Sequence, residues 1–157
     1  MQRSHWNTAH VALPLRIVPE RGSGAEHLGH GKDSIMAKAL SVAQPWAWAI
    51  IHGSKRIENR RYRTSHRGPL FIHASKSREW LGTEGDLLPT LPPYSDLVYG
   101  AIIGVVDVVD CVPVEQVAGD PFAEGPWCWI LENPRAIEPF PCRGQQNLFS
   151  VPLDDTP

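Results

Sequence analysis

The longest apolar run of the chain is the feature that most restricts its fold. It spans residues 101–111, is rich in valine and isoleucine, and is interrupted by Gly104, Asp107 and Asp110. β-Branched side chains favour extended backbone over helix, so the run predicts a long β-strand. It is also far shorter than the roughly 20 apolar residues that a bilayer-spanning helix needs. The run therefore indicates a β-rich protein and argues against a membrane protein.

Shorter apolar segments repeat this pattern from Met36 onward, with Gly and Pro residues between them. Further strands are predicted over residues 38–42, 57–62, 70–74, 127–131 and 147–151. Asn133-Pro134 is expected to end the fourth of these strands. Many short strands at this spacing predict an α+β, β-rich fold built on a small barrel-like sheet.

Two short helices are expected beside the sheet. Pro45 precedes the apolar run 46–51 and Gly53 follows it, which is the arrangement of residues that begins and ends a helix. A second helix is expected within residues 75–88. The sequence thus predicts a β-sheet flanked by brief helical segments.

The first part of the chain differs from the rest. Residues 1–35 mix Gly, His, Pro and Arg without sustained apolar periodicity, which predicts a disordered N-terminal extension. The folded domain is then expected over residues 36–152, with a loose tail over 153–157. A domain of this size can bury a sizeable core.

Positive charge is concentrated in one short segment. Residues 52–80 hold eight Lys or Arg against two Glu, a net charge of +6, whereas the whole chain carries −2. Such a segment attracts polyanions and makes their binding depend on salt. The alternative is a solvated basic face that pairs with acidic residues of the C-terminal half.

One motif inside this segment carries a family resemblance. Gly53-Ser54-Lys55-Arg56-Ile57-Glu58-Asn59-Arg60 follows Gln44-Pro45-Trp46-Ala47 and fits the pattern G-x-K-x-x-E-x-R. Further segments agree in order: Arg67 to Ser75, Gly104 to Asp110, Trp129 to Pro134, and Pro141 to Gly144. Over residues 37–152 the chain resembles the ASCH domain family. The resemblance implies a β-barrel of the PUA-like superfamily that binds RNA or modified nucleosides in a cleft beside the motif.

The motif supplies the first candidate site. On an extended strand Glu58 and Arg60 point the same way, and Lys55 stands at the preceding turn. Arg60 suits bidentate binding of phosphate, Lys55 offers a point charge, and Glu58 can hold both cations in place. The three side chains are expected at the mouth of the cleft. A purely structural ion network around the turn is the alternative.

Other residues join this candidate site. Trp46 and Trp127 are candidates for stacking on a base, whereas Trp48 and Trp129 are expected to pack in the core. The remaining binding candidates are Arg61, Arg63 and His73, although a histidine in an apolar strand is more often a satisfied core residue. Weaker candidates are Gln44, Lys76, Asp107 and Glu124.

Binding and catalysis both remain open. Some members of the family that this chain resembles hydrolyse N4-acetylcytidine, and they carry Thr where this chain has Glu58. Ribonuclease activity is known for other members. A carboxylate beside Lys55 favours the charged ammonium, which opposes a role as base or nucleophile. If the protein is an enzyme, Lys55 and Glu58 are the catalytic candidates, and a metal-independent ribonuclease is the leading form. A protein-interaction module is the third possibility.

The cysteines and histidines predict no further cofactor chemistry. Cys111, Cys128 and Cys142 are odd in number and form no C-x-x-C pair, and the seven histidines are scattered. We therefore expect buried free thiols, no metal ion, no organic cofactor and a cytoplasmic location. RNA or a nucleoside is the expected partner.

Overall fold

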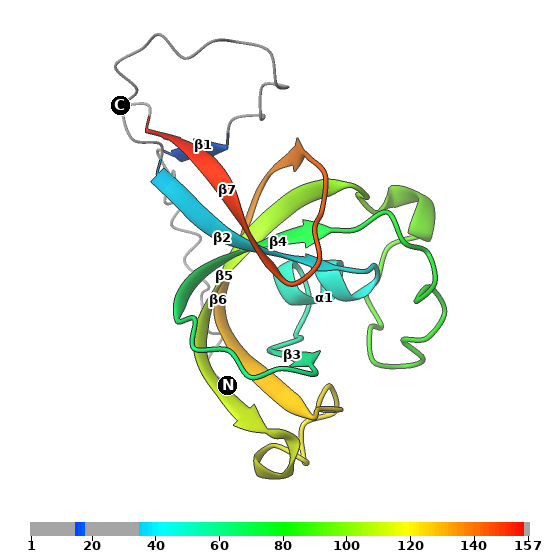
Figure 1. Ribbon diagram of the computed structural model, residues 1–157. Helices are drawn as coiled ribbons and strands as arrows, with labels where there is room; N and C mark the ends of the chain where they lie inside the picture. Colours follow the sequence, from blue (N-terminus) through cyan, green and yellow to red (C-terminus); the bar gives the residue numbers. More distant parts are fainter. Residues whose placement is uncertain (1–14, 18–34, 156–157) are drawn as a thin grey trace, which may run out of the picture.

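The computed structural model describes residues 15–17 and 35–155. Within these residues, seven strands form one sheet, joined by three short helical segments (Figure 1). The strands are β1 (Leu15–Ile17), β2 (Ile35–Val42), β3 (Ile57–Arg60), β4 (Gly68–Ala74), β5 (Ala101–Pro113), β6 (Trp127–Pro141) and β7 (Leu148–Asp155). The helical segments are the α-helix α1 (Trp46–Ile51) and the 3₁₀ turns η1 (Tyr94–Asp96) and η2 (Val114–Gln116).

The strands follow the order β1-β7-β2-β4-β5-β6-β3. β2 and β4 are parallel, and every other neighbouring pair is antiparallel. The long strands β5 and β6 bend strongly along their length (Figure 1). The predicted β-rich fold with short helices is confirmed. Over the described residues, however, β1 and β3 are the two edges of an open sheet, so a closed barrel stays a prediction.

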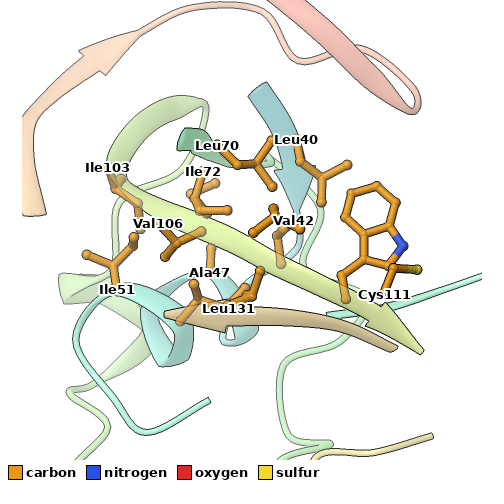
Figure 2. Close-up of a cluster of buried hydrophobic side chains, with 14 residues drawn as sticks. Leu40, Val42, Ala47, Ile51, Leu70, Ile72, Ile103, Val106, Cys111 and Leu131 are labelled. Carbon is orange, nitrogen blue, oxygen red and sulfur yellow. The ribbon is translucent and has the colours of Figure 1, made fainter. Parts of the chain in front are cut away.

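Both faces of the central strands are buried. Consecutive residues of a strand point to opposite faces, and here both sets are apolar. Leu40 and Ile72 pack in the cluster that faces α1, whose side chains converge from the strands and the helix in Figure 2. Phe71 and Val105 pack on the other face with Phe149 of β7. This double burial explains the nearly continuous apolar runs of the sequence.

The predicted helix over residues 46–51 is confirmed as α1. It packs against β4, β5 and β6, and it buries Ala47, Ile50 and Ile51. Gly104 of β5 lets the helix come this close, because a Cβ there would lie 2.6 Å from Ile51 Cδ1 and 2.6 Å from the Arg135 carbonyl oxygen. The helix thus fixes the start of the turn that carries the G-x-K-x-x-E-x-R motif.

The prediction of a helix within residues 75–88 is wrong. This segment is a series of turns, such as the one closed by a 3.2 Å hydrogen bond from the Thr83 amide to the Trp80 carbonyl. Gly82 and Gly85 take φ values of +87° and +51°, which interrupt a right-handed helix. Leu88 is the one buried residue of the segment, so a helix there would have no apolar face to pack.

The prediction that the strand beginning at Trp127 ends at Asn133-Pro134 is also wrong, because this strand, β6, continues to Pro141. Between the pairs Val105↔Arg135 and Asp107↔Glu132, β5 advances two residues while β6 advances three. The extra residue makes a β-bulge, where Asn133 has a φ of 54°. The chain therefore passes the proline by bulging rather than by ending the strand.

Strand pairing reaches both ends of the described chain. Leu15–Ile17, inside the predicted extension, pairs with β7 as strand β1. β7 in turn continues through residues 153–155 of the predicted tail. The rest of the extension and the last two residues lie outside the described residues, so the predicted domain limits stay predictions.

Candidate functional site

The structure brings Lys55, Glu58 and Arg60 together. The Lys55 ammonium donates hydrogen bonds to Glu58 Oε2 at 3.1 Å and to the Ile57 carbonyl oxygen. Glu58 Oε1 accepts a 3.2 Å hydrogen bond from Arg60 Nε, so one carboxylate joins two cations. Arg60 Nη2 donates to the Ser41 carbonyl oxygen at 2.8 Å. The cluster thereby ties β3 to β2.

Burial changes the expected role of Lys55. Its side chain is 5% exposed, against 29% for Arg60. The ammonium therefore lies beneath the surface rather than at the mouth of a cleft. Arg60 is the most exposed member of the cluster.

The local chain path accounts for this burial. After α1 ends, the Lys55 amide donates to the Ala49 carbonyl at 3.1 Å. Arg56 Nη1 donates to the carbonyls of Ile50 and Lys55, which satisfies an acceptor at the end of the helix. The turn is thus folded back against the helix, and the Lys55 side chain is directed inward toward β3.

A cleft of about 800 Å³ opens next to this cluster. It lies between the ends of β2 and β4 and the segment that follows β6. Its lining is Ser41, His73, Ser75, Lys76, Gly100, Pro141, Cys142, Arg143, Gly144, Gln145 and Gln146. Two of these residues are cationic and, among the described residues that line the cleft, none is acidic. The cleft therefore favours an anionic ligand.

His73 forms the floor of this cleft and is 2% exposed. Its Nδ1 lies 3.0 Å from Ser41 Oγ and its Nε2 lies 2.8 Å from the Cys142 carbonyl oxygen. Burial lowers the pKa of His73, and the hydrogen bond to Cys142 acts in the opposite direction. His73 is thus a buried, satisfied histidine, which is one of the two roles expected from the sequence, and its binding role stays a prediction.

Gly144 closes over the floor of the cleft. A Cβ at this position would lie 2.4 Å from Ser41 Oγ and 2.7 Å from His73 Cε1. Any side chain would have to displace the groups it covers, so the close approach requires glycine. The position of the 142–147 segment above His73 depends on this contact.

A second, smaller cavity of about 300 Å³ lies beside α1. Gln44 is buried there, where its Nε2 donates to the Val98 carbonyl and its Oε1 accepts from the Trp48 amide, both at 2.9 Å. Trp48 lines this cavity and is partly exposed, and it also packs against the core cluster that contains Ala49 and Ile57. Through its two hydrogen bonds Gln44 fixes the start of α1. Burial lowers the pKa of His52, which lines the same cavity.

The aromatic and arginine candidates lie in mixed surroundings. Trp46 is partly buried and packs edge-on against Phe122, with ring centroids 6.3 Å apart, so it is a packing residue here. The Arg63 guanidinium lies 5.7 Å from the centroid of the Trp127 ring, which is partly exposed. Arg61 is exposed. Trp129 is buried as expected.

Asp107 lies apart from both the motif cluster and the cleft. Its carboxylate accepts hydrogen bonds from both Arg135 Nη atoms, at 3.2 and 3.3 Å, and one from Asn133 Nδ2 at 3.2 Å. Burial alone would raise the pKa of Asp107, but these hydrogen bonds and the Arg135 charge lower it. Asp107 therefore stabilises the bulge in β6.

Glu124 is exposed and contributes its backbone amide, which donates to Asn59 Oδ1 at 2.8 Å. Asn59 Oδ1 also accepts from the Gly125 amide, and its Nδ2 donates to the Phe122 carbonyl. No role for Asn59 is predicted from the sequence. One side chain of β3 thus holds the loop that precedes β6.

Most of the cleft was missed from the sequence. Pro141 to Gly144 was noted only for its family resemblance, and nothing in the local pattern marked Ser41, Gln145 or Gln146. Ser41 and the segment 141–146 are far apart in the chain, and both lie against His73 in the fold. The juxtaposition of Ser41 with His73 in the parallel ladder of β2 and β4 was the missing information.

Cys111 and Cys128 are buried free thiols, as the sequence predicts, whereas the free thiol Cys142 is only partly buried. Burial raises the pKa of the Cys142 thiol, while a hydrogen bond with the Ile102 backbone acts the other way. Across residues 15–17 and 35–155 no group of three metal-ligating side chains comes together. In the same part of the chain, no helix has the length and hydropathy to span a membrane.

The structure thus has a curved β-rich sheet and a cluster of Lys55, Glu58 and Arg60 just after α1. Comparison of the sequence with known protein families identifies the family of this chain. A sequence model of the ASCH domain matches residues 40–141. The chain therefore belongs to the ASCH domain family.

Two curated relatives are activating signal cointegrator 1 from Homo sapiens, 29% identical over 127 residues, and its Mus musculus counterpart, 28% identical. Each match covers 71% of this chain but 22% of the relative, so the chain spans about a fifth of their length. Among solved structures, ASCH from Zymomonas mobilis aligns with a TM-score of 0.49 at 15% identity, covering 71% of this chain and 85% of that one. A point mutant of that protein aligns with a TM-score of 0.48.

Proposed function

We propose that this ASCH domain binds single-stranded RNA, or a modified nucleoside, in the cleft above His73. The observation that carries the proposal is the charge of the lining, in which Lys76 and Arg143 are exposed and no acidic side chain is present among the described residues. In residues 15–17 and 35–155 neither cation has an ion-pair partner. Both are therefore free to neutralise phosphate.

The motif cluster supports this site from one side. Arg60 holds the backbone of Ser41, a cleft residue, and it is itself partly exposed. We assign Arg60 a phosphate or base contact, with Glu58 orienting its guanidinium. Lys55 supports the arrangement through Glu58 rather than by touching the ligand.

RNA cleavage is the alternative function. His73 in the cleft is the group that favours it, because a neutral imidazole can accept a proton from a ribose 2′-hydroxyl. Lys55 is a poor base, since its ammonium is engaged by Glu58 and the Ile57 carbonyl. N4-acetylcytidine hydrolysis in turn has only Lys55 and Glu58 as its catalytic candidates.

Binding of a fluorescent single-stranded RNA oligonucleotide across a salt series tests the proposal. Lys76→Ala and Arg143→Ala should each weaken binding and lower the slope of log affinity against log salt by about one. Lys38→Ala is the matched control, since Lys38 is an exposed lysine outside the lining of the cleft. No binding at low salt, or equal losses in all three variants, would refute this site.

The same sample, incubated with RNA and EDTA and then with N4-acetylcytidine, distinguishes binder from enzyme. Intact RNA and intact nucleoside would support binding alone. Shortened RNA would instead establish a metal-independent ribonuclease. Binding that is absent for RNA but present for the free nucleoside would limit the ligand to the nucleoside.

A further inference from the structure

Ser41 and His73 are paired directly across the β2–β4 ladder, and their side chains meet in the cleft. Ser41 Oγ lies 3.0 Å from His73 Nδ1, and His73 Nε2 lies 2.8 Å from the Cys142 carbonyl oxygen. The three groups thus form a continuous line of hydrogen bonds. None of them belongs to the G-x-K-x-x-E-x-R motif.

The chemistry of the acceptor fixes the direction of these hydrogen bonds. The Cys142 carbonyl oxygen can only accept, so His73 Nε2 carries the proton. In the neutral ring Nδ1 is then unprotonated and accepts the hydrogen bond from the Ser41 hydroxyl. This is the relation of a nucleophile to a base that a third group orients.

The surrounding residues hold this arrangement in place. The His73 ring packs edge-on against Phe149, with ring centroids 6.1 Å apart, and Arg60 binds the Ser41 carbonyl. Gly144 approaches Ser41 Oγ and the His73 ring more closely than any other residue type could. Ser41 remains partly exposed and lines the open cleft. The pair is therefore preorganised, with a buried histidine and a partly exposed serine that borders the cleft.

We propose that Ser41 is the nucleophile of an ester-hydrolysing site, with His73 as its general base and the Cys142 carbonyl as the group that orients the ring. The proposal goes beyond RNA binding and does not depend on it. Lys76 and Arg143 line the same cleft without an acidic neighbour in the lining, so the substrate class is a carboxylic ester that carries an anionic group.

The reaction balances without a cofactor. Ser41 Oγ bonds to the ester carbonyl carbon while its proton passes to His73 Nδ1. The bond from that carbon to the alcohol oxygen breaks, and His73 returns the proton to the departing alcohol. Water then attacks the acyl-serine, with His73 taking one of its protons. That proton goes back to Ser41 as the carboxylic acid leaves.

The environment of His73 suits a base. Burial lowers its pKa, so the ring is neutral at physiological pH and Nδ1 is free to accept a proton. When Nδ1 becomes protonated, the Cys142 carbonyl stabilises the Nε2–H of the imidazolium. A carbonyl does this less strongly than the carboxylate of a Ser-His-Asp triad, because it carries no full charge.

A fluorophosphonate probe tests for this nucleophile on the full-length chain. An activated serine displaces fluoride and forms a bond to phosphorus, which intact-protein mass spectrometry detects. We expect one adduct on the wild-type protein and on Ser65→Ala, which changes an exposed serine outside the lining of the cleft. Ser41→Ala should give none. His73→Gln should slow labelling about a hundredfold or more.

Hydrolysis of the 4-nitrophenyl half-ester of succinic acid, compared with neutral 4-nitrophenyl acetate, tests the substrate class. Ser41→Ala should abolish turnover of the anionic ester, and Lys76→Ala should remove its advantage over the neutral one. Circular-dichroism melting of each variant shows whether it is folded, and imidazole added to His73→Ala should restore part of the labelling.

No adduct on the folded wild-type protein, or an adduct that persists in Ser41→Ala, would overturn the proposal. RNA binding without an adduct would overturn this inference alone. An adduct on a protein that binds neither RNA nor the nucleoside would overturn the proposed function alone.

Discussion

At the scale of single residues, the motif of this ASCH domain is defined by one carboxylate that serves two cations. Glu58 is buried and accepts from Lys55 on one oxygen and from Arg60 on the other. Lys55 is nearly inaccessible, so removing its partner would leave a buried ammonium with the Ile57 carbonyl as its remaining acceptor. The spacing of Lys55, Glu58 and Arg60 in the motif thus has a structural reason beside any functional one.

Glu58→Gln should therefore destabilise the protein strongly. Breaking a buried ion pair by removing one partner costs about 3–5 kcal/mol, because the other charge stays buried. Asp110→Asn is the matched control, since Asp110 pairs with Arg67 at 3.7 Å on the surface, where a pair contributes about 0–1 kcal/mol. Urea unfolding at neutral pH measures both. Comparable losses in the two variants would show that the Glu58 cluster is not a stabilising network.

At the scale of elements, the cleft depends on a short segment rather than on a strand. Residues 142–147 connect β6 to β7 and supply five lining residues, Cys142 to Gln146. The Cys142 amide donates to the Gly100 carbonyl at 3.2 Å, and its carbonyl accepts from His73, so the segment is held at its start. Its position over the sheet then rests on the close approach of Gly144.

Gly144→Ala should disturb this segment with little effect elsewhere. The new Cβ would overlap Ser41 Oγ and the His73 ring, and such overpacking costs about 1–3 kcal/mol. RNA binding and fluorophosphonate labelling should both fall. Gly119→Ala is the control, because a Cβ there meets nothing within 4 Å, and it should change stability by no more than about 0.5 kcal/mol. Unchanged binding and labelling in folded Gly144→Ala would show that the segment does not form the site.

At the scale of the whole molecule, one sheet with two buried faces carries the fold, and its edges are short. β1 adds only Leu15–Ile17 to the outside of β7. β7 itself is held from its other side by β2 over six residue pairs. The core clusters draw on β2 to β7 and on α1. The part of the chain from Ile35 onward therefore contains the described core.

A chain that begins at Ile35 should fold and bind RNA like the full-length protein. Loss of β1 removes a three-residue edge pairing, for which we expect a fall in Tm of no more than about 4 °C, equivalent to roughly 1 kcal/mol for a domain between 100 and 150 residues long. Thermal melting by circular dichroism, followed by the RNA titration, measures both properties. A larger fall, or a loss of affinity, would show that residues 1–34 belong to the domain.

Much of this protein follows from its sequence alone. The β-branched runs, the Pro45 and Gly53 limits of α1 and the ASCH motif each depend on residues within about ten positions of one another. Such local patterns determine element type and family because backbone propensity and motif spacing are local properties. The helix within residues 75–88 and the strand end at Asn133-Pro134 were predicted incorrectly, because packing and strand register, which are not local properties, decide the structure there.

Only the tertiary structure decided the site. The sequence placed Lys55 at an opening, but the turn after α1 buries it, and the cleft instead forms where Ser41, His73 and Gly144 meet. These three residues come from β2, β4 and the segment after β6, and no periodicity links them. Parallel pairing of β2 with β4 sets Ser41 against His73. Contacts between residues so distant in sequence are fixed by strand order and by the packing of both sheet faces, which is why the local pattern could not reveal them.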